Sequence, residues 1–383
     1  MNYLRVCHAI YRGRLWNETC DVKEEIMAFL KLYRKKLQHN YAYLRNLFEQ
    51  QNIQWGIVTK LLCGTKAYLQ EVIDLGIKEI HDSRISNLKR VKQLNPAIKT
   101  VYIKPPAKRS IPNIVRYADV SLNTEYTTIK LISEEAQRQG KKHQIIIMIE
   151  LGDLREGVMP EGVVDFYEQI FRLPNIEVVG LGSNLNCLHG VMPSEDKLIQ
   201  LVLYKQIIEL KFNRKIPLIS AGTTVTLPLL LQNRLPKGIN HFRVGEALYW
   251  GNNLFTGDII PEMETDLIEL FAEIIEITEK PVIPIGVLAE NPSGEMFQIN
   301  EEDYGKSTYR CIIDVGLLDI RPEFLIPKDD DLEIVGASSD MLVIDLKENP
   351  RNYHTGDLLA FKLKYMGALS LLNSYYIEKV VVE

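Results

Sequence analysis

The feature of this chain that most constrains its fold is an alternation of short apolar runs with amphipathic segments. Runs such as 57–58 and 144–150 are apolar enough for buried strands. Segments with helical periodicity follow them, as at 125–139, where Gly140 supplies a C-cap. This alternation predicts parallel βαβ units, and about eight of them in about 230 residues predict a TIM (β/α)8 barrel. We expect a first strand at 28–32, and then the alternating strands at 57–58, 79–82, 100–103, 120–122, 144–150, 176–181, 218–220 and 241–244.

The pattern changes after Asn253. Helical periodicity nearly disappears from there on, and short strand-like runs recur between turn signals such as His354-Thr355-Gly356-Asp357. This indicates an all-β domain, built as a sandwich or a barrel. We therefore expect residues 29–253 to form the barrel and residues 254–383 to form a C-terminal β-domain. Residues 1–28 show no clean period, so they form either an N-terminal extension or a strand of the later domain.

The size and charge of the chain argue against several classes of protein. Its 383 residues fit two domains, and a net charge of −5 argues against a nucleic-acid-binding surface. No apolar run approaches the roughly 18–20 residues of a membrane helix, and the N-terminus lacks the apolar core of a signal peptide. The five cysteines lack C-x-x-C spacing, which indicates neither a disulfide framework nor a zinc site. We expect a cytoplasmic protein without a metal site, acting on neither nucleic acid nor membrane.

A lysine follows the run Trp55–Val58, at the end of a predicted barrel strand. Ammonium groups are rarely buried unless they are paired or used, and barrels place their chemistry at the carboxyl ends of the strands. Lys60 therefore either makes a salt bridge at the surface or takes part in chemistry. Other polar residues that we expect at these strand ends are His81, Asp82, Asn123, Arg155, Asn184, Asn186, Ser220, Thr223, Thr224 and Arg243.

Three loops at these ends combine glycine with polar side chains: 150–157, 219–226 and 242–251. Glycine allows the backbone to approach a ligand closely, which suits Arg155 in the first loop for binding; the alternative is a surface turn. In the second loop, Ser220, Thr223 and Thr224 precede a predicted helix, as in a phosphate site or an ordinary N-cap. Arg243 in the third loop either faces a ligand or makes a surface ion pair.

Taken together, Val58-Thr59-Lys60, the Arg155-Glu156-Gly157 step, and the loops 220–224 and 243–251 resemble the alanine racemase family of fold-type III pyridoxal phosphate (PLP) enzymes. Further runs narrow the resemblance to ornithine racemase and its relatives; they lie at 81–84, 151–157, 182–185, 236–241 and 336–340. The resemblance extends over about residues 28–382. It implies a homodimeric, PLP-dependent racemase of a basic amino acid such as ornithine.

The resemblance assigns roles around the PLP ring, one position at a time. Lys60 matches the lysine that forms the internal aldimine, and its amine removes the α-proton of the substrate. Arg243 matches the arginine that faces the pyridine nitrogen, where a guanidinium donates a hydrogen bond without giving up its proton. Arg155 matches an arginine near the phenolic oxygen. Asn184 stands where alanine racemases carry a histidine against the ring.

Other matched positions concern the phosphate and the partner subunit. Thr224, with Thr223 before it, matches a phosphate-binding Asn-Ser pair, and Ser220 belongs to the same hydroxyl-rich loop. Tyr375 matches a phosphate-contacting tyrosine. Asp340, with Ser339 before it, matches a pair that reaches the active site of the neighbouring subunit, which implies shared active sites in the dimer.

The sequence departs from the family pattern at the second proton donor. Alanine racemases use a tyrosine in a Tyr-Gly step, but the matching position here is Ile285, which transfers no proton. Cys187 is one replacement candidate, because a thiol exchanges protons near neutral pH if its pKa is lowered. The alternative for Cys187 is an inert thiol. Tyr304 and Asp340 are further candidates.

Two rival functions follow from the same residues. The missing tyrosine favours a PLP-binding regulatory or carrier protein without turnover, but such proteins usually lack the β-domain of residues 254–383. Another fold-type III enzyme is the second rival. Decarboxylases of that fold carry a triple-glycine loop and a cysteine-aspartate motif, which this chain lacks. The metal-dependent aldolases need a His/Cys cluster near the C-terminus, where only His354 lies.

Overall fold

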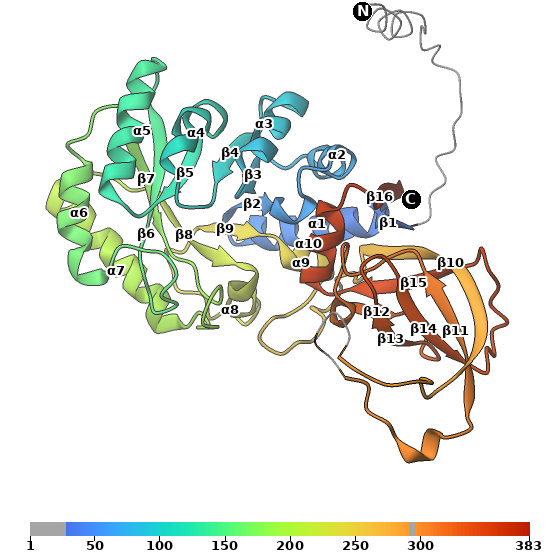
Figure 1. Cartoon of the computed structure of the whole chain (residues 1–383). Coiled ribbons are helices and arrows are strands. Elements are labelled where there is room, and N and C mark those ends of the chain that lie inside the picture. Colours follow the sequence, from blue (N-terminus) through green and yellow to red (C-terminus); the bar gives the residue numbers. More distant parts are fainter. Residues whose placement is uncertain (1–27, 291–293, 295) are drawn as a thin grey trace, which may run out of the picture.

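The computed structural model describes residues 28–290, 294 and 296–383. Eight parallel strands close into a barrel, shown from blue to yellow in Figure 1, which confirms the predicted TIM barrel. They are β2 (Gln54–Val58), β3 (Glu79–Asp82), β4 (Lys99–Tyr102), β5 (Val120–Asn123), β6 (His143–Met148), β7 (Ile176–Gly182), β8 (Leu218–Thr223) and β9 (His241–Val244).

Helices cover the outside of the barrel and connect its strands (Figure 1). Their apolar residues are buried, as are Leu88 and Val91 of α3 (Ile85–Leu94), which contacts β3 and β4. The connecting helices are α1 (Arg34–Gln50), α2 (Lys66–Asp74), α3 (Ile85–Leu94), α4 (Ile111–Tyr117), α5 (Tyr126–Arg138), α6 (Val163–Ile170), α7 (Glu195–Phe212), α8 (Leu227–Leu231) and α9 (Glu246–Trp250). Among the described residues, no helix is long and apolar enough to cross a membrane.

The C-terminal part is a largely antiparallel sheet with the strand order β12-β15-β10-β11-β14-β13, which confirms the predicted β-domain. Its strands are β10 (Ile268–Pro281), β11 (Ser307–Ile313), β12 (Leu325–Pro327), β13 (Glu333–Ala337), β14 (Leu342–Lys347), β15 (Leu358–Leu363) and β16 (Glu378–Val382). The sequence pattern did not predict the helix α10 (Tyr365–Asn373), which packs against the barrel turn η1 (Lys60–Leu62).

Strand β1 (Ala28–Tyr33) lies within the range that we expect to form the barrel, but it pairs elsewhere. It runs antiparallel to β10 and parallel to β16, so it is part of the C-terminal sheet. Figure 1 shows β1, in blue, beside the dark red β16. The physical reason is burial on one face only: Ala28, Leu30 and Leu32 are buried and the residues between them are half-buried. Residues 1–27 of the expected N-terminal extension lie outside the described residues.

Candidate active site

A cavity of about 810 Å³ opens where the barrel strands end and the C-terminal domain begins. Eight of the residues predicted from the sequence line it: Lys60, Arg155, Asn184, Asn186, Cys187, Thr223, Thr224 and Arg243. The barrel therefore brings together side chains from the ends of five different strands, as the strand-end argument requires. Glu156, Glu246, Tyr249 and Tyr365 also line the cavity, and the sequence argument did not single them out.

Lys60 is positioned by the residue before it. Thr59 is buried, and its hydroxyl donates to a carboxylate oxygen of Asp82 at 2.9 Å. Asp82 also accepts from the backbone N–H of Arg84 and from Asn87, so it ties the end of β2 to the start of α3. Burial raises the pKa of Asp82 to about 6. The Nζ atom of Lys60 lies 5.8 Å from the ring centre of Tyr365, within the range of a cation–π contact.

Arg243 lies at the floor of the cavity and is only 4% exposed. Its Nη2 donates to the backbone oxygen of Ser183 at 2.9 Å and to Oδ1 of Asn184 at 2.6 Å. Its Nη1 donates to the backbone and side-chain oxygens of Ser220. Burial lowers the pKa of Arg243 to about 10, which still leaves the guanidinium charged at neutral pH. The hydrogen bonds compensate for the lost hydration of this buried charge.

A second network continues along one wall of the cavity. The Nδ2 of Asn184 donates to Oε1 of Glu156 at 2.5 Å, and Nη2 of Arg155 donates to the same oxygen at 2.7 Å. Nε of Arg155 donates to the other oxygen of Glu156. Asn184 therefore links two arginines through one carboxylate, so that the positive charges of Arg243 and Arg155 flank the negative charge of Glu156.

The threonine loop is held from below by packing and hydrogen bonds. The hydroxyl of Thr224 accepts from the backbone N–H of Ala247 at 3.2 Å. Gly222 is required just before the threonines, because a Cβ there would lie 2.1 Å from the ring of Phe242. Thr223 and Thr224 are thus fixed at the edge of the cavity, with hydroxyls suited to an anionic group.

Three of the residues predicted to bind the cofactor or to reach the partner's site do not line this cavity. Ser220 is fully buried beneath Arg243, because it lies inside β8 and points toward β9. Tyr375 is fully exposed, since it follows the end of α10. The tyrosines that line the cavity are Tyr249 and Tyr365, and Tyr365 lies at the start of the same helix. Asp340 is exposed in the turn between β13 and β14 of the C-terminal sheet.

Cys187 lines the cavity, but its environment differs from the one the proton-donor hypothesis needs. Burial raises the pKa of its thiol, and the nearby charges of Arg155 and Lys60 only partly oppose this. Tyr304, a further proton-donor candidate, is 65% exposed and, like Asp340, does not line the cavity.

Comparison with known proteins identifies the family. The family model described as alanine racemase, N-terminal domain, matches residues 33–253. The chain is 34% identical over 345 residues to ornithine racemase of Acetoanaerobium sticklandii, which covers 90% of this chain and 96% of that protein. The chain belongs to the alanine racemase family. This amino-acid racemase is also 28% identical over 346 residues to lysine racemase of Thermotoga maritima, covering 90% of this chain and 96% of that protein.

Solved structures share the fold of the racemase. Alanine racemase from Bartonella henselae, described with covalently bound pyridoxal phosphate, matches it with a TM-score of 0.71. The match covers 93% of this chain and 99% of that one at 14% sequence identity, so it bears on the fold alone. Both the barrel and the C-terminal sheet therefore belong to a known architecture.

The residues of the racemase that sequence reasoning missed carried weak signals. Tyr365 opens a helix directly after β15, in a region where the pattern indicated only strands. Glu156 directly follows the predicted site residue Arg155, and Glu246 directly follows the turn at Gly245. These positions would have been enough to place both glutamates at the cavity. Tyr249 lies in the short helix α9, where the sequence pattern indicates only a buried aromatic side chain of the core.

Proposed function

We propose that this racemase binds pyridoxal phosphate at Lys60 and inverts the α carbon of a basic amino acid such as ornithine. The observation that carries the proposal is the joint placement of Lys60, Arg243 and the threonine pair around one cavity. A lysine for covalent attachment, a guanidinium and a hydroxyl-rich loop are the three kinds of group that an aldehyde, a ring nitrogen and a phosphate need.

The cavity residues fit such a ligand by their unused polar atoms. All four hydrogen bonds of Arg243 come from its two Nη atoms, and Nε has no partner among the described residues. The hydroxyl of Tyr249 is buried, also without a partner in the described part of the chain, and Tyr249 lines the cavity. A buried hydroxyl without a partner is costly, so a polar ligand here would satisfy Tyr249 and could also accept a hydrogen bond from Nε of Arg243.

Some residues of the cavity would bind the cofactor, and Lys60 would also transfer the α-proton of the substrate. Bound pyridoxal phosphate supplies an electron-withdrawing ring that makes the α-proton of an amino acid easier to remove. Lys60 would hold the cofactor, and its Nζ would take or return the α-proton on one face of the substrate. Arg243 would face the ring nitrogen and keep its own proton, because a guanidinium stays charged there. Thr223 and Thr224 would hold the phosphate.

Glu246 is the group that we propose for recognising the side-chain ammonium of the substrate. Two carboxylates line the cavity, and Glu156 is already paired through both oxygens with Arg155 and Asn184. Glu246 makes only a long hydrogen bond, 3.3 Å, with Asn252 among the described residues. It therefore has oxygen lone pairs available for an ammonium group. The names of the two relatives, an ornithine and a lysine racemase, support a basic substrate.

We further propose that the racemase is a homodimer. Ile285 and Val287 are at least nine-tenths exposed, although both are apolar, and Asp340 is exposed on the same domain. Exposed apolar side chains in a loop mark a contact surface for another chain. Sedimentation of the purified protein at several concentrations tests this, and a monomer at every concentration would contradict it.

Borohydride reduction tests the attachment site. After incubation with pyridoxal phosphate and reduction, peptide mapping should find the cofactor on Lys60. The variant Lys60→Ala should carry none, while Lys66→Ala, at the start of α2, should carry it as the wild type does. Attachment at another residue, or none, would overturn the proposal.

Isotope exchange tests the reaction. The protein is incubated with pyridoxal phosphate and L-ornithine in heavy water, and optical rotation is followed together with deuterium at the α carbon. Racemisation predicts loss of rotation with deuterium uptake. Deuterium uptake without loss of rotation would contradict inversion, and no uptake with any of the common amino acids would contradict turnover.

A further inference from the structure

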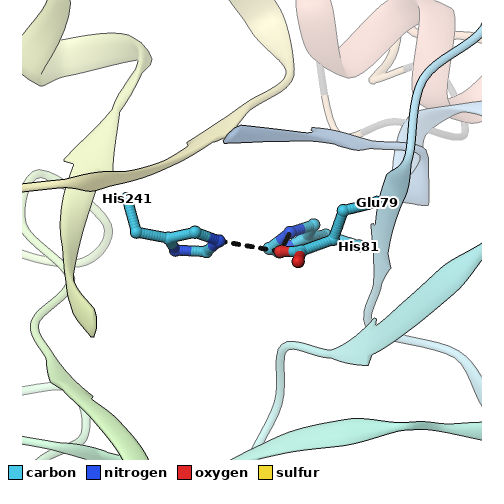
Figure 2. A group of neighbouring side chains, drawn as sticks. All are labelled: Glu79, His81 and His241. Atoms are coloured by element: carbon cyan, nitrogen blue, oxygen red, sulfur yellow. Dashed lines mark hydrogen bonds and ion pairs between the residues drawn. The ribbon is translucent and has the colours of Figure 1, made fainter. Parts of the chain in front are cut away.

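A buried group of polar side chains lies beneath Arg243, on the inside of the barrel. Oε1 of Glu79 lies 2.6 Å from Nε2 of His81 and 2.7 Å from Nε2 of His241. Figure 2 shows the three side chains meeting between β3 and β9. All three are buried, with both histidines at most 1% exposed. The racemase chemistry described above does not use any of them.

The proton positions in this group follow from its charges. Burial alone would raise the pKa of Glu79, but hydrogen bonds from His241 and His81 hold it well below the usual value, so Glu79 is ionised. Its other oxygen, Oε2, pairs with Nζ of Lys99 at 2.8 Å. Both histidines must therefore donate to Oε1 from Nε2. Burial lowers the pKa of His81 to about 4, so its ring is neutral at pH 7.

The hydrogen bonds between His241 and Arg243 run in the same donor-to-acceptor direction. His241 donates from Nε2, so Nδ1 is the ring nitrogen left to accept, and it lies 2.7 Å from Oγ of Ser220. The Ser220 hydroxyl thus donates to His241, and its oxygen lone pairs accept from Nη1 of Arg243. Every hydrogen bond in the chain Arg243–Ser220–His241–Glu79 then points the same way and ends on a buried carboxylate.

We propose that Ser220, His241 and Glu79 form a relay of positioning residues that fixes the guanidinium of Arg243 in the orientation needed at the cavity. The relay rests on the proposed function for its effect on the reaction. Chains of aligned hydrogen bonds polarise one another in a low-dielectric interior, so the negative charge of Glu79 acts on Arg243 through His241 and Ser220. The anion also offsets part of the cost of burying the Arg243 cation.

A metal site is the alternative interpretation of this group, because one carboxylate and two imidazoles offer ligand atoms within 4.8 Å of one another. A zinc ion needs each ligand atom at about 2.0–2.2 Å, which sets neighbouring ligand atoms more than about 3 Å apart. The separations of 2.6 and 2.7 Å found here are hydrogen-bond lengths. The Lys99 ammonium on the second oxygen of Glu79 would also repel a cation. We therefore assign the group to the relay.

A second serine–histidine pair in the same barrel offers a matched control. Oγ of Ser121 lies 2.9 Å from Nε2 of His143, and both residues are buried. This pair joins β5 to β6 and makes no hydrogen bond to Arg243. Substituting Ser121→Ala and Ser220→Ala therefore removes the same kind of buried hydrogen bond, once outside the relay and once within it.

The test combines kinetics with a direct view of the histidine protons. Ser220→Ala should lower kcat for racemisation by about tenfold, the effect of losing a hydrogen bond to a charged group, with KM changed less than twofold. Ser121→Ala should leave kcat within about twofold of the wild type while losing similar thermal stability. Equal losses of kcat in the two variants would overturn the relay.

Nitrogen NMR of the [15N]histidine-labelled full chain gives a readout that needs no substrate. The wild type should show His241 with a protonated Nε2 and a bare, hydrogen-bonded Nδ1, both with and without pyridoxal phosphate. In Ser220→Ala the Nδ1 signal should move toward that of a nitrogen without a hydrogen bond. A protonated Nδ1 in the wild type, or a bound metal whose removal lowers kcat, would contradict the proposal. Failure of Lys60 labelling would instead strike the proposed function and leave these signals unchanged.

Discussion

At the scale of single residues, the site is a row of alternating charges. Lys99 pairs with Glu79, which is joined to Arg243 through His241 and Ser220. Arg243 is joined in turn through Asn184 to Glu156, which pairs with Arg155. Buried charges are tolerated only where opposite charges and hydrogen bonds accompany them. This explains why a charged guanidinium persists at the floor of the cavity. It also leaves Glu246 as a carboxylate with spare capacity at the cavity wall.

The substitution Glu246→Gln tests substrate recognition. It removes the charge proposed to meet the side-chain ammonium, so KM for L-ornithine should rise by about tenfold, the loss of one charge-assisted hydrogen bond. KM for L-norvaline, which has the same carbon chain without the amine, should change little. Steady-state kinetics with both substrates measure the difference. A similar rise for both amino acids would show that Glu246 does not read the ammonium group.

At the scale of elements, β1 fastens the barrel to the C-terminal sheet. The fully buried hydroxyl of Tyr68 on α2 donates to the backbone oxygen of Leu30 in β1 at 2.9 Å and lies 3.2 Å from that of Val380 in β16. One barrel helix therefore contacts the first and the last strand of the sheet at the same point. This contact should contribute to the stability of both domains.

The variant Tyr68→Phe isolates this contact, because it removes only the hydroxyl. It leaves the buried carbonyl of Leu30 and the part-buried carbonyl of Val380 with one partner fewer, and we expect the free energy of unfolding to fall by about 1–3 kcal/mol. Urea denaturation followed by circular dichroism measures it. The control Tyr375→Phe alters a fully exposed hydroxyl and should leave the midpoint unchanged. No loss in Tyr68→Phe would mean that the hydroxyl does not link the two parts.

The sequence predicted elements better than it predicted their partners. Strand and helix periodicity is local, so the barrel and the position of Lys60 at the end of β2 followed from neighbouring residues. The pairing of β1 with β10 and β16 is non-local, and the alternating residues of β1 fit either domain. The same reason hid the relay, since Glu79 and His241 meet only when the barrel closes. The match of Tyr375 rests on the resemblance alone, whereas Tyr365 reaches the cavity at the start of α10, a helix that the sequence pattern does not predict.

At the scale of the whole molecule, buried histidines make stability depend on pH. Burial lowers the pKa of both His81 and His143 to about 4, against about 6.5 in an unfolded chain. Between these pH values the unfolded chain binds more protons, so stability is lost as the pH falls from 6.5 toward 4. Asp82 acts in the opposite direction, because its raised pKa of about 6 favours the folded state as it takes up a proton.

Two histidines outweigh one aspartate in this balance. We expect the free energy of unfolding to be about 2–3 kcal/mol lower at pH 5 than at pH 7. Urea denaturation at the two pH values measures the difference. The variant His143→Gln keeps a side-chain amide near Ser121 but does not titrate, so it should reduce the pH dependence markedly. Equal stability at pH 5 and pH 7 in the wild type would contradict the neutral, buried state of both rings.

The position of β1 also affects how the racemase is made. A ribosome releases β1 before any barrel strand, but both of its neighbours, β10 and β16, are translated only after the barrel is complete. During that interval the nascent chain carries an apolar strand with two bare edges, the kind of segment that invites wrong pairing. Wrong pairing of β1 should therefore be suppressed only once residues 378–382 are free to pair and β1 is enclosed on both sides.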